Sequence, residues 1–451
     1  MTSAVLDALH AAVPRDSVVT DPDVVESYRH DRALTISPGH PIALVRAGST
    51  AEVRATLEVA SRFGVPVVTR GAGTGLSGGS SAVDGCITLS TERMRAVRID
   101  RAGMQAVVQP GLLNAELKAA ARAEGLWYPP DPSSYEICSI GGNLATNAGG
   151  LCCVKYGVTT DYVLGLEVVL ADGRTLRLGG STVKNVAGYD LKRLFIGSEG
   201  TLGVITEATL ALRPVPPVPT TIAATFPDAV RAGEAVAAIT ASLRPSALEL
   251  MDAAAIDAVQ RVTPMGFGSE VGALLIAQTD ADPAEADVVA EHCRAAGAAD
   301  VVVSDDEVEG ELLMGARRRA ITCVERLGAV LIEDVGVPVP RVPELIAAVA
   351  DVAARRRTLV PVIGHAGDGN LHPLVTFDPT DHAARDRAEM AFDEIMDAAL
   401  DLGGTVTGEH GIGSLKARQL GRQLGDDVME LTRTVKAALD PAGILNPGKW
   451  I

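Results

Sequence analysis

Hydrophobic and polar positions near the start of the chain predict a strand, a helix and a second strand. Residues 41–48 (PIALVRAG) form an apolar run that favours a strand, and residues 65–69 (VPVVT) favour another. Between them, residues 51–63 (AEVRATLEVASRF) are typical of an amphipathic helix. Ser49 and Glu52 have the spacing of a capping box at its start, and the glycine after residue 63 supplies its end.

The second strand leads into a glycine-rich loop, residues 70–80 (RGAGTGLSGGS). Gly73, Gly75 and Gly78 match G-x-G-x-x-G, the fingerprint of dinucleotide-binding Rossmann folds, which requires a helix directly after the third glycine. Here a turn at Asp84–Gly85 and a β-branched strand follow instead, so the required context is missing. We expect a loop between two strands whose backbone N–H groups hold a phosphate, with a flexible surface loop as the alternative.

Two more regions rich in Gly, Ser and Asn follow, at residues 131–150 and 184–212. Between them, residues 162–178 predict a hairpin that turns at Asp172–Gly173. Three such loops in one block indicate close approach of the backbone to a ligand at several points. A long ligand threaded among the loops explains this pattern better than a single phosphate does.

A proline-rich stretch, residues 213–220 (RPVPPVPT), predicts a stiff, extended linker and a domain boundary. Beyond it, strands alternate with helices of ~10–15 residues in three successive units. This pattern predicts an α+β sheet with helices on one face.

Composition restricts the function. With 451 residues, of which 47% are hydrophobic, the chain can form two or three domains. A net charge of −17 and only 3% aromatic residues argue against nucleic-acid binding, and an anionic ligand would need local cations. The six cysteines show no C-x-x-C or zinc-like spacing and suggest reduced thiols. Residues 1–16 predict a short amphipathic helix and no signal peptide, and no apolar run is long enough to span a bilayer. We expect a cytoplasmic protein, either free or bound peripherally at the inner face of the membrane.

Candidate chemistry lies in two glycine-rich loops near the C-terminal end. In residues 359–377 (LVPVIGHAGDGNLHPLVTF) two alternating strands flank a turn, with His365 and His372 at its two ends. A later strand end is followed by Glu409 and His410. Two imidazoles and a carboxylate suit Zn²⁺, Mn²⁺ or Fe²⁺ with positions open for substrate, which leaves His410 as a base. The alternative is that these histidines are surface or hydrogen-bonded core residues.

Three further features have two interpretations each. Asp368 either binds the metal or, more in keeping with G-D-G-N, fixes the turn. Asn370 either reaches the substrate or tolerates a left-handed backbone. The three arginines in residues 316–320 (ARRRA) form either a solvated helix face or a clamp for a carboxylate.

Taken together, these motifs resemble the FAD-linked 2-hydroxy-acid dehydrogenases, the group of cytochrome-type D-lactate dehydrogenase, the flavin subunit of glycolate oxidase and D-2-hydroxyglutarate dehydrogenase. The resemblance rests on PVVTRGAGTGLSGG, the region of residues 131–150, KYGVTTDYVLGLEVVLADG, GSEGTLGVITEATL, GHAGDGNLHP, GEHGIG and LDPAGILNPGKW, and extends from about residue 40 to the C-terminus. It implies an α+β fold of the vanillyl-alcohol-oxidase type, with a two-subdomain FAD-binding domain, an α+β, ferredoxin-like cap and a C-terminal helical segment. We place an N-terminal helical segment at residues 1–35, the FAD-binding domain at 36–215, the substrate or cap domain at 216–405 and the C-terminal segment, which completes the active site, at 406–451.

The resemblance implies non-covalent FAD, because the histidine that tethers FAD in some relatives is missing from residues 70–80. The first loop would hold the pyrophosphate, the second region would lie beside the ribityl chain and ring, and the third would lie on the adenine side. The implied cofactor-binding residues are Arg70, Gly71, Ala72, Gly73, Thr74, Gly75, Leu76, Ser77 and Gly78; Pro130, Asp131, Ser134, Gly141, Asn143, Thr146 and Asn147; Glu199, Gly203, Val204 and Ile205; and Asn446.

The resemblance also implies the active-site roles. His365, His372 and Glu409 match the ligands of a divalent metal, zinc or manganese, and His410 matches the catalytic base. Asn370, in the same motif, is a further candidate catalytic residue.

Substrate recognition is implied in the same way. Arg317 matches the arginine that binds the substrate carboxylate, and the spacing to Ala320 favours it over Arg318. A tryptophan usual one turn earlier is replaced by Met314. Members that act on 2-hydroxyglutarate carry a lysine where this chain has Ile332, so we expect a shorter or more apolar substrate.

Together, these features of the resemblance imply an FAD- and metal-dependent dehydrogenase that oxidises a small anionic D-2-hydroxy acid, lactate-like or glycolate, to the 2-oxo acid. No iron–sulfur cysteine pattern is present, so electrons must pass to a separate acceptor: a quinone, a cytochrome, an electron-transfer flavoprotein or a partner subunit. The alternatives are a D-2-hydroxyglutarate dehydrogenase, an oxidase that uses O₂ directly, a nicotinamide-dependent dehydrogenase and a non-catalytic flavin-binding subunit. A homodimer is one oligomeric state that we consider.

Overall fold

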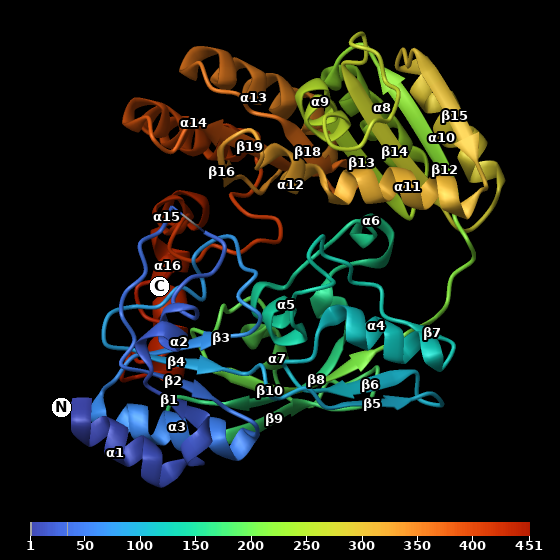
Figure 1. Ribbon diagram of the computed structural model, residues 1–451. Coiled ribbons are helices and arrows are strands. Elements are labelled where there is room, and N and C mark those ends of the chain that lie inside the picture. The colour runs from blue at the N-terminus through green and yellow to red at the C-terminus, as the bar shows by residue number, and fades with distance from the viewer. Residues whose placement is uncertain (1, 34) are drawn as a thin grey trace. The chain divides into compact units, whose positions relative to one another are not determined.

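The computed structural model describes residues 2–33 and 35–451. The chain divides into two compact units (Figure 1). Unit 1 contains residues 1–149, 158–215 and 409–451, and unit 2 contains residues 150–157 and 216–408. Among the helices described, none combines the length and the apolar character that crossing a bilayer requires.

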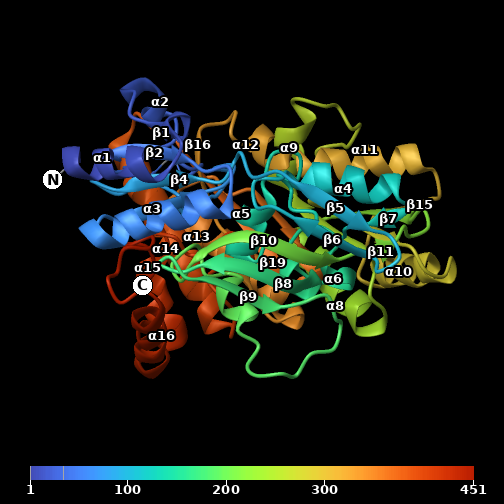
Figure 2. The same ribbon diagram turned by 90° about the horizontal axis from the view of Figure 1, so that it is seen from below.

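Unit 1 contains a four-stranded sheet in the order β1-β2-β4-β3. Strands β2 (Ala43–Arg46), β4 (Ile87–Ser90) and β3 (Val67–Arg70) are parallel, and β1 (Val18–Val19) joins β2 antiparallel. Strand β1 lies in the N-terminal segment, which the sequence predicted to be helical only. Helices α1 (Thr2–Ala12) and α3 (Thr50–Phe63) lie side by side in Figures 1 and 2 and share one apolar core with the sheet.

The predicted boundaries of α3 are confirmed in detail. Ser49 accepts a hydrogen bond from the backbone N–H of Glu52, and Gly64 ends the helix with a left-handed backbone at φ 63°. Val53 and Leu57 bury the apolar stripe of this helix in the core. Local sequence therefore sets both ends and the inner face of α3.

The second sheet of unit 1 is antiparallel, in the order β5-β6-β10-β8-β9. Its strands are β5 (Val97–Asp100), β6 (Gln105–Val108), β10 (Val204–Ala211), β8 (Val163–Val169) and β9 (Thr175–Gly179). Strands β8 and β9 form the hairpin predicted around Asp172–Gly173. Helices α4 (Asn114–Ala123) and α5 (Ile140–Thr146) pack on this sheet through Leu117 and Leu144.

Helix α5 differs from the glycine-rich loop that the sequence suggested. Ser139 caps its first turn by accepting a hydrogen bond from the N–H of Gly142, and Asn147 ends it with φ 52°. Capping and burial of Ile140 and Leu144 compensate for the poor helix propensity of the two glycines. The other α-helices and strands described in unit 1 are α2 (Pro22–Glu26), β7 (Leu126–Trp127), α7 (Lys192–Phe195), β11 (Arg213–Pro214), α15 (Ala417–Leu424) and α16 (Asp426–Leu439).

Unit 2 is built on one antiparallel sheet in the order β15-β12-β14-β13-β18-β19-β16, with β17 also pairing with β19. The strands are β12 (Thr220–Phe226), β13 (Ala247–Asp252), β14 (Ala273–Thr279), β15 (Asp300–Ser304), β16 (Ala329–Ile332), β17 (Val335–Gly336), β18 (Val362–His365) and β19 (Asn370–Phe377).

Helices cover both faces of this sheet, so the prediction of helices on one face is wrong. Met251 and Ile363 face a core shared with α9 (Ala253–Gln260), α11 (Glu307–Arg318) and α12 (Ala320–Val324). The other helices are α8 (Ala229–Ser242), α10 (Ala284–Ala295), α13 (Val342–Arg356) and α14 (His382–Asp401), of which α8 and α10 lie against the opposite face. The physical reason is that β13 and β14 are buried at nearly every position, so the side chains on both faces of these strands need cover.

Residues 150–157 interrupt unit 1 in sequence but belong to unit 2. They contain α6 (Cys153–Tyr156). Lys155 forms an ion pair of 2.5 Å with Asp280, and Leu151 lies in the core of unit 2. Packing and charge therefore fix residues 150–157 within unit 2.

Candidate active site

The glycine-rich loop of residues 70–80 offers a row of backbone donors. Gly73 and Gly78 have left-handed backbone, with φ of 73° and 81°. In the part of the chain that the structure describes, no backbone N–H from Gly73 to Gly79 donates a hydrogen bond to another residue. Such a run of available N–H groups suits a phosphate, so this loop fits a pyrophosphate. No helix lies between Arg70 and the next strand, as the sequence predicted.

Ser139 links the second glycine-rich region to this loop. Its Oγ accepts hydrogen bonds from the backbone N–H groups of Ala72, at 3.3 Å, and Gly142, at 3.2 Å. The Oδ1 of Asn143 accepts a hydrogen bond of 3.0 Å from Asn114. The N-terminal end of α5 thus lies against the glycine-rich loop. The predicted residues of this region are placed on the segment entering α5 (Pro130, Asp131 and Ser134), in the helix (Gly141, Asn143 and Thr146) and at its C-cap (Asn147).

Glu199, predicted on the adenine side, is 7% exposed, and its carboxylate binds backbone N–H groups. Its two oxygens accept hydrogen bonds of 2.8 Å from the N–H groups of Ile412 and Gly413. Burial raises the pKa of Glu199 to about 7, although these two hydrogen bonds and Lys449 lower it. This carboxylate therefore fixes the loop that begins two residues after His410.

Two other predicted residues fasten the same loops. Ser77 donates a hydrogen bond of 3.1 Å from Oγ to the backbone carbonyl of His410. Asn446 donates from Nδ2 to the carbonyls of Gly79, at 2.8 Å, and Glu199, at 2.7 Å. Gly203 directly precedes β10, and Val204 and Ile205 begin it; all three residues are buried. Unit 1 thus brings the predicted flavin segments and the backbone of His410 into one hydrogen-bonded assembly.

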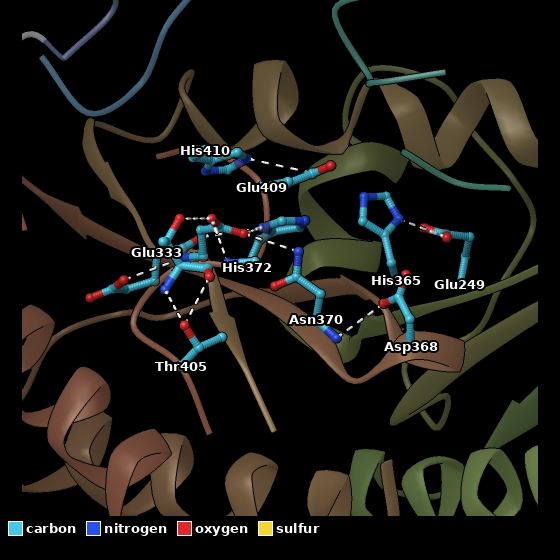
Figure 3. A network of polar contacts seen from close by, with 12 residues as sticks. Glu249, Glu333, His365, Asp368, Asn370, His372, Thr405, Glu409 and His410 are labelled. Carbon is cyan, nitrogen blue, oxygen red and sulfur yellow. Dashed lines mark hydrogen bonds and ion pairs between the residues drawn. The ribbon is translucent and has the colours of Figure 1, made fainter. Parts of the chain in front are cut away.

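His365 and His372 lie on neighbouring strands of the predicted hairpin in unit 2. The register pairs His365 with Asn370 and Ile363 with His372, so both histidines and Asn370 share one face of the sheet. Both side chains are buried, and their ring centroids are 5.1 Å apart with an interplanar angle of 85° (Figure 3). The hairpin therefore brings two imidazoles close together.

Glu249 lies opposite His365 on strand β13. Its Oε1 is 2.8 Å from Nδ1 of His365, and its Oε2 is 2.9 Å from Nη2 of Arg317. Arg317 is 1% exposed, whereas Arg318 is partly exposed and pairs with Glu311 at 3.4 Å. Of the neighbouring arginines, Arg317 is thus the one directed into the interior.

Asp334, in the turn between β16 and β17, contacts Asn370 and His372 on the face that they share with His365. Its carboxylate accepts hydrogen bonds from Asn370 Nδ2 at 3.0 Å, Thr407 Oγ1 at 2.6 Å and the N–H of Gly408 at 3.0 Å. It also lies 3.6 Å from Nδ1 of His372. Asn370 Oδ1 is buried and accepts no hydrogen bond from the described residues, which is the condition expected of an atom that meets a ligand.

Glu409 and His410 follow Gly408 directly in the chain. Consecutive Cα atoms are ~3.8 Å apart, so the anchored Gly408 determines where Glu409 begins. The carboxylate of Glu409 is 3.7 Å from Nε2 of His410. The strand predicted just before them is reduced to one bridge between Gly336 and Thr405.

Comparison with known proteins identifies the family of the chain. Residues 215–450 match the family described as FAD linked oxidases, C-terminal domain, and residues 41–179 match the FAD binding domain. The chain belongs to the FAD-linked oxidases. This FAD-linked oxidase is therefore an oxidoreductase with an FAD-binding domain.

Relatives of known name cover most of this FAD-linked oxidase. Glycolate oxidase subunit GlcD of Bacillus subtilis is 40% identical over 416 residues, which is 91% of this chain and 88% of the relative. D-lactate dehydrogenase of Archaeoglobus fulgidus is 35% identical over 94% of this chain and 96% of the relative.

A solved structure confirms the fold. p-Cresol methylhydroxylase with bound substrate has a TM-score of 0.81 at 18% identity and covers 99% of this chain and 96% of its own. The implied fold of the vanillyl-alcohol-oxidase type is therefore correct for this FAD-linked oxidase.

The sequence prediction missed two buried carboxylates of this FAD-linked oxidase, Glu249 and Asp334. Both are 0% exposed. Each interrupts an apolar strand or strand end, ALELM in one case and VLIED in the other. An acidic residue within an apolar run was the available signal, because a carboxylate is buried only with partners.

Proposed function

We propose that this FAD-linked oxidase is a dehydrogenase that oxidises a D-2-hydroxy acid, lactate-like or glycolate, to the corresponding 2-oxo acid. One observation carries the proposal: His365, His372 and Asn370 share a buried face, and Glu409 and His410 follow the glycine that Asp334 anchors. The names of the two relatives, a glycolate oxidase subunit and a D-lactate dehydrogenase, support this substrate class.

FAD would be held without a covalent bond. The available N–H groups from Gly73 to Gly79 suit its pyrophosphate, and α5 and the Glu199 region are proposed for the rest of the molecule. When bound, FAD supplies the acceptor for the hydride that leaves C2 of the substrate. The residues of unit 1 bind and orient it.

The donor set fits a divalent metal, zinc or manganese. We assign His365, His372 and Glu409 as its ligands, with Asp334 as a further oxygen donor. Asp334 and His372 offer ligand atoms within 4.8 Å of each other, whereas His365 does not belong to that group of potential ligands among the described residues. When bound, the metal supplies a Lewis acid that lowers the pKa of the substrate hydroxyl. Asn370 Oδ1, a buried acceptor, would accept a hydrogen bond from a polar group of the substrate.

Arg317 would bind the substrate carboxylate through Nε and Nη2, which form no hydrogen bond of good geometry within the described residues. His410 would accept the hydroxyl proton as C2 loses its hydride. Ile332, at the end of β16, provides no cation for a second carboxylate, which favours a lactate-like acid or glycolate over 2-hydroxyglutarate. Electrons would then pass to a separate acceptor of the classes named above.

The test compares the parent with His372→Ala and with His382→Ala, a matched control because His382 is exposed at the start of α14. Turnover of D- and L-lactate, glycolate and D-2-hydroxyglutarate is measured with a dye acceptor, with and without a chelator. We expect loss of bound metal and at least a ~10²-fold loss of turnover in His372→Ala only. Equal turnover of D-lactate and glycolate by all three proteins would contradict the proposal.

A further inference from the structure

A buried carboxylate joins two residues to which separate tasks are assigned. Glu249 on β13 lies directly opposite His365 on β18 in the antiparallel register. It is also the ion-pair partner of Arg317, which approaches from the C-terminal end of α11. The three residues come from positions 249, 317 and 365, yet their side chains form one continuous chain of contacts (Figure 3 shows Glu249 and His365).

The contact between Glu249 and His365 determines which nitrogen of the imidazole carries the proton. A carboxylate oxygen is an acceptor, so the nitrogen 2.8 Å from Glu249 Oε1, Nδ1, carries the proton and donates it. The other nitrogen, Nε2, then carries the lone pair of the neutral ring. Metal-binding histidines commonly have this arrangement, because the second partner fixes both tautomer and ring orientation.

The contact with Arg317 leaves part of the guanidinium available. Nη2 lies 2.9 Å from Glu249 Oε2, but neither Nη2 nor Nε forms a hydrogen bond of good geometry within the described residues. The side chain is 1% exposed, so water does not satisfy these donors freely. A buried guanidinium with unused donors is suited to a planar acceptor such as a carboxylate.

A purely stabilising ion pair would also bury Glu249 with Arg317. It would not require the second oxygen of Glu249 to face Nδ1 of His365. Nor would it leave donors of Arg317 unsatisfied in the interior, where such groups are costly. The contacts on both sides therefore favour a role in positioning.

We propose that Glu249 is a positioning residue: it holds His365 with Nε2 directed at the metal and holds Arg317 in place for the substrate carboxylate. This inference rests on the proposed function. It adds that one carboxylate couples metal binding to substrate binding, so that a change in Glu249 weakens both. Neither effect is expected from loss of an ordinary ion pair on α11.

The experiment compares Glu249→Gln with Glu311→Gln. Glu311 is a matched control, because it pairs with Arg318 on the same helix but is exposed. Zn²⁺ affinity of the chelator-treated protein is measured by titration calorimetry, and binding of oxalate by the change in flavin absorbance. For Glu249→Gln we expect Zn²⁺ affinity to fall ~10–100-fold and oxalate to bind more weakly, with both affinities unchanged in Glu311→Gln. Unchanged Zn²⁺ and oxalate affinities in Glu249→Gln would overturn the inference.

A second measurement applies to the parent protein and does not depend on how the variant folds. Nitrogen-15 NMR of labelled histidine, with the signal of His365 assigned by comparison with His365→Asn, reports its tautomer. We expect the proton on Nδ1, and a proton on Nε2 in the metal-free protein would overturn the inference. If the parent binds no Zn²⁺ and oxidises no 2-hydroxy acid, the proposed function fails together with the inference. If the parent does both and Glu249→Gln matches it, only the inference fails.

Discussion

Glu199 should make the stability of the chain depend on pH in a way that one substitution removes. The carboxylate is buried, and its pKa is raised from 4.5 to about 7, mainly by burial. The hydrogen bonds from Ile412 and Gly413 and the charge of Lys449 oppose this shift, and Asp31 adds to it. A carboxyl whose folded pKa lies above its unfolded value favours folding while it is protonated. This contribution is complete below pH ~4.5 and is lost as the pH rises through about 7.

The magnitude follows from the shift. The difference of about 2.5 units, 7 minus 4.5, corresponds to about 3 kcal/mol at 1.36 kcal/mol per unit. Between pH 5 and pH 8, which covers most of the transition, the parent should lose about 2 kcal/mol through this group. For a unit of this size that equals a change of about 4–8 °C in the melting temperature.

The assay is the melting temperature of the parent, Glu199→Gln and Glu124→Gln at pH 5 and pH 8. Glu124 is the matched control because it is exposed at the end of α4. The amide in Glu199→Gln can accept only one of the two backbone hydrogen bonds, so we expect it to be less stable at both pH values. The informative quantity is the difference between pH 5 and pH 8, which should be smaller in Glu199→Gln than in the other two proteins. If the three differences agree within 1 °C, the reasoning about burial at this site is wrong.

Two further substitutions test the loop and the core of unit 1. In Gly73→Ala, φ of 73° disfavours a side chain and the new Cβ would lie 2.1 Å from Nη2 of Arg70, so we expect FAD affinity to fall at least ~10-fold. Titration of the apoprotein with FAD measures this affinity. Gly64→Ala is the control, because Gly64 has a similar φ but no atom lies within 4 Å of the added Cβ. Equal FAD affinities of the two variants would count against the loop as the pyrophosphate site. Leu57→Ala should lower the free energy of unfolding by about 2–5 kcal/mol, because Leu57 is 0% exposed in the core that α1 and α3 share with the four-stranded sheet. Chemical denaturation measures this, and Val186→Ala, at a 97% exposed position, should change it by less than ~0.5 kcal/mol.

Features governed by neighbouring residues could be predicted from the sequence. The start and end of α3, the turn of the β8–β9 hairpin and the hairpin that joins His365 to His372 all depend on caps, turn residues and alternation within a few positions. The missing helix after Gly78, which argued against a Rossmann unit, is of the same kind. The long motifs that resemble the FAD-linked oxidases likewise lie in continuous stretches, and the family assignment is confirmed.

Other features depend on which distant segments meet. Glu249 and His365 are 116 positions apart, and only the register of β13 with β18 makes them partners. Glu199 meets Ile412 across 213 positions in the same way. The helices on both faces of the second sheet also required the tertiary structure, although the apolar runs of β13 and β14 were a signal for them.

The sequence by itself thus determined the local elements of this protein, its family and the chemical groups available for a site. Only the tertiary structure decided which carboxylates hold the histidines and loops and which backbone donors are left for a ligand. The reason is physical: caps and turns depend on contacts between near neighbours, whereas strand register and burial depend on the packing of the whole unit.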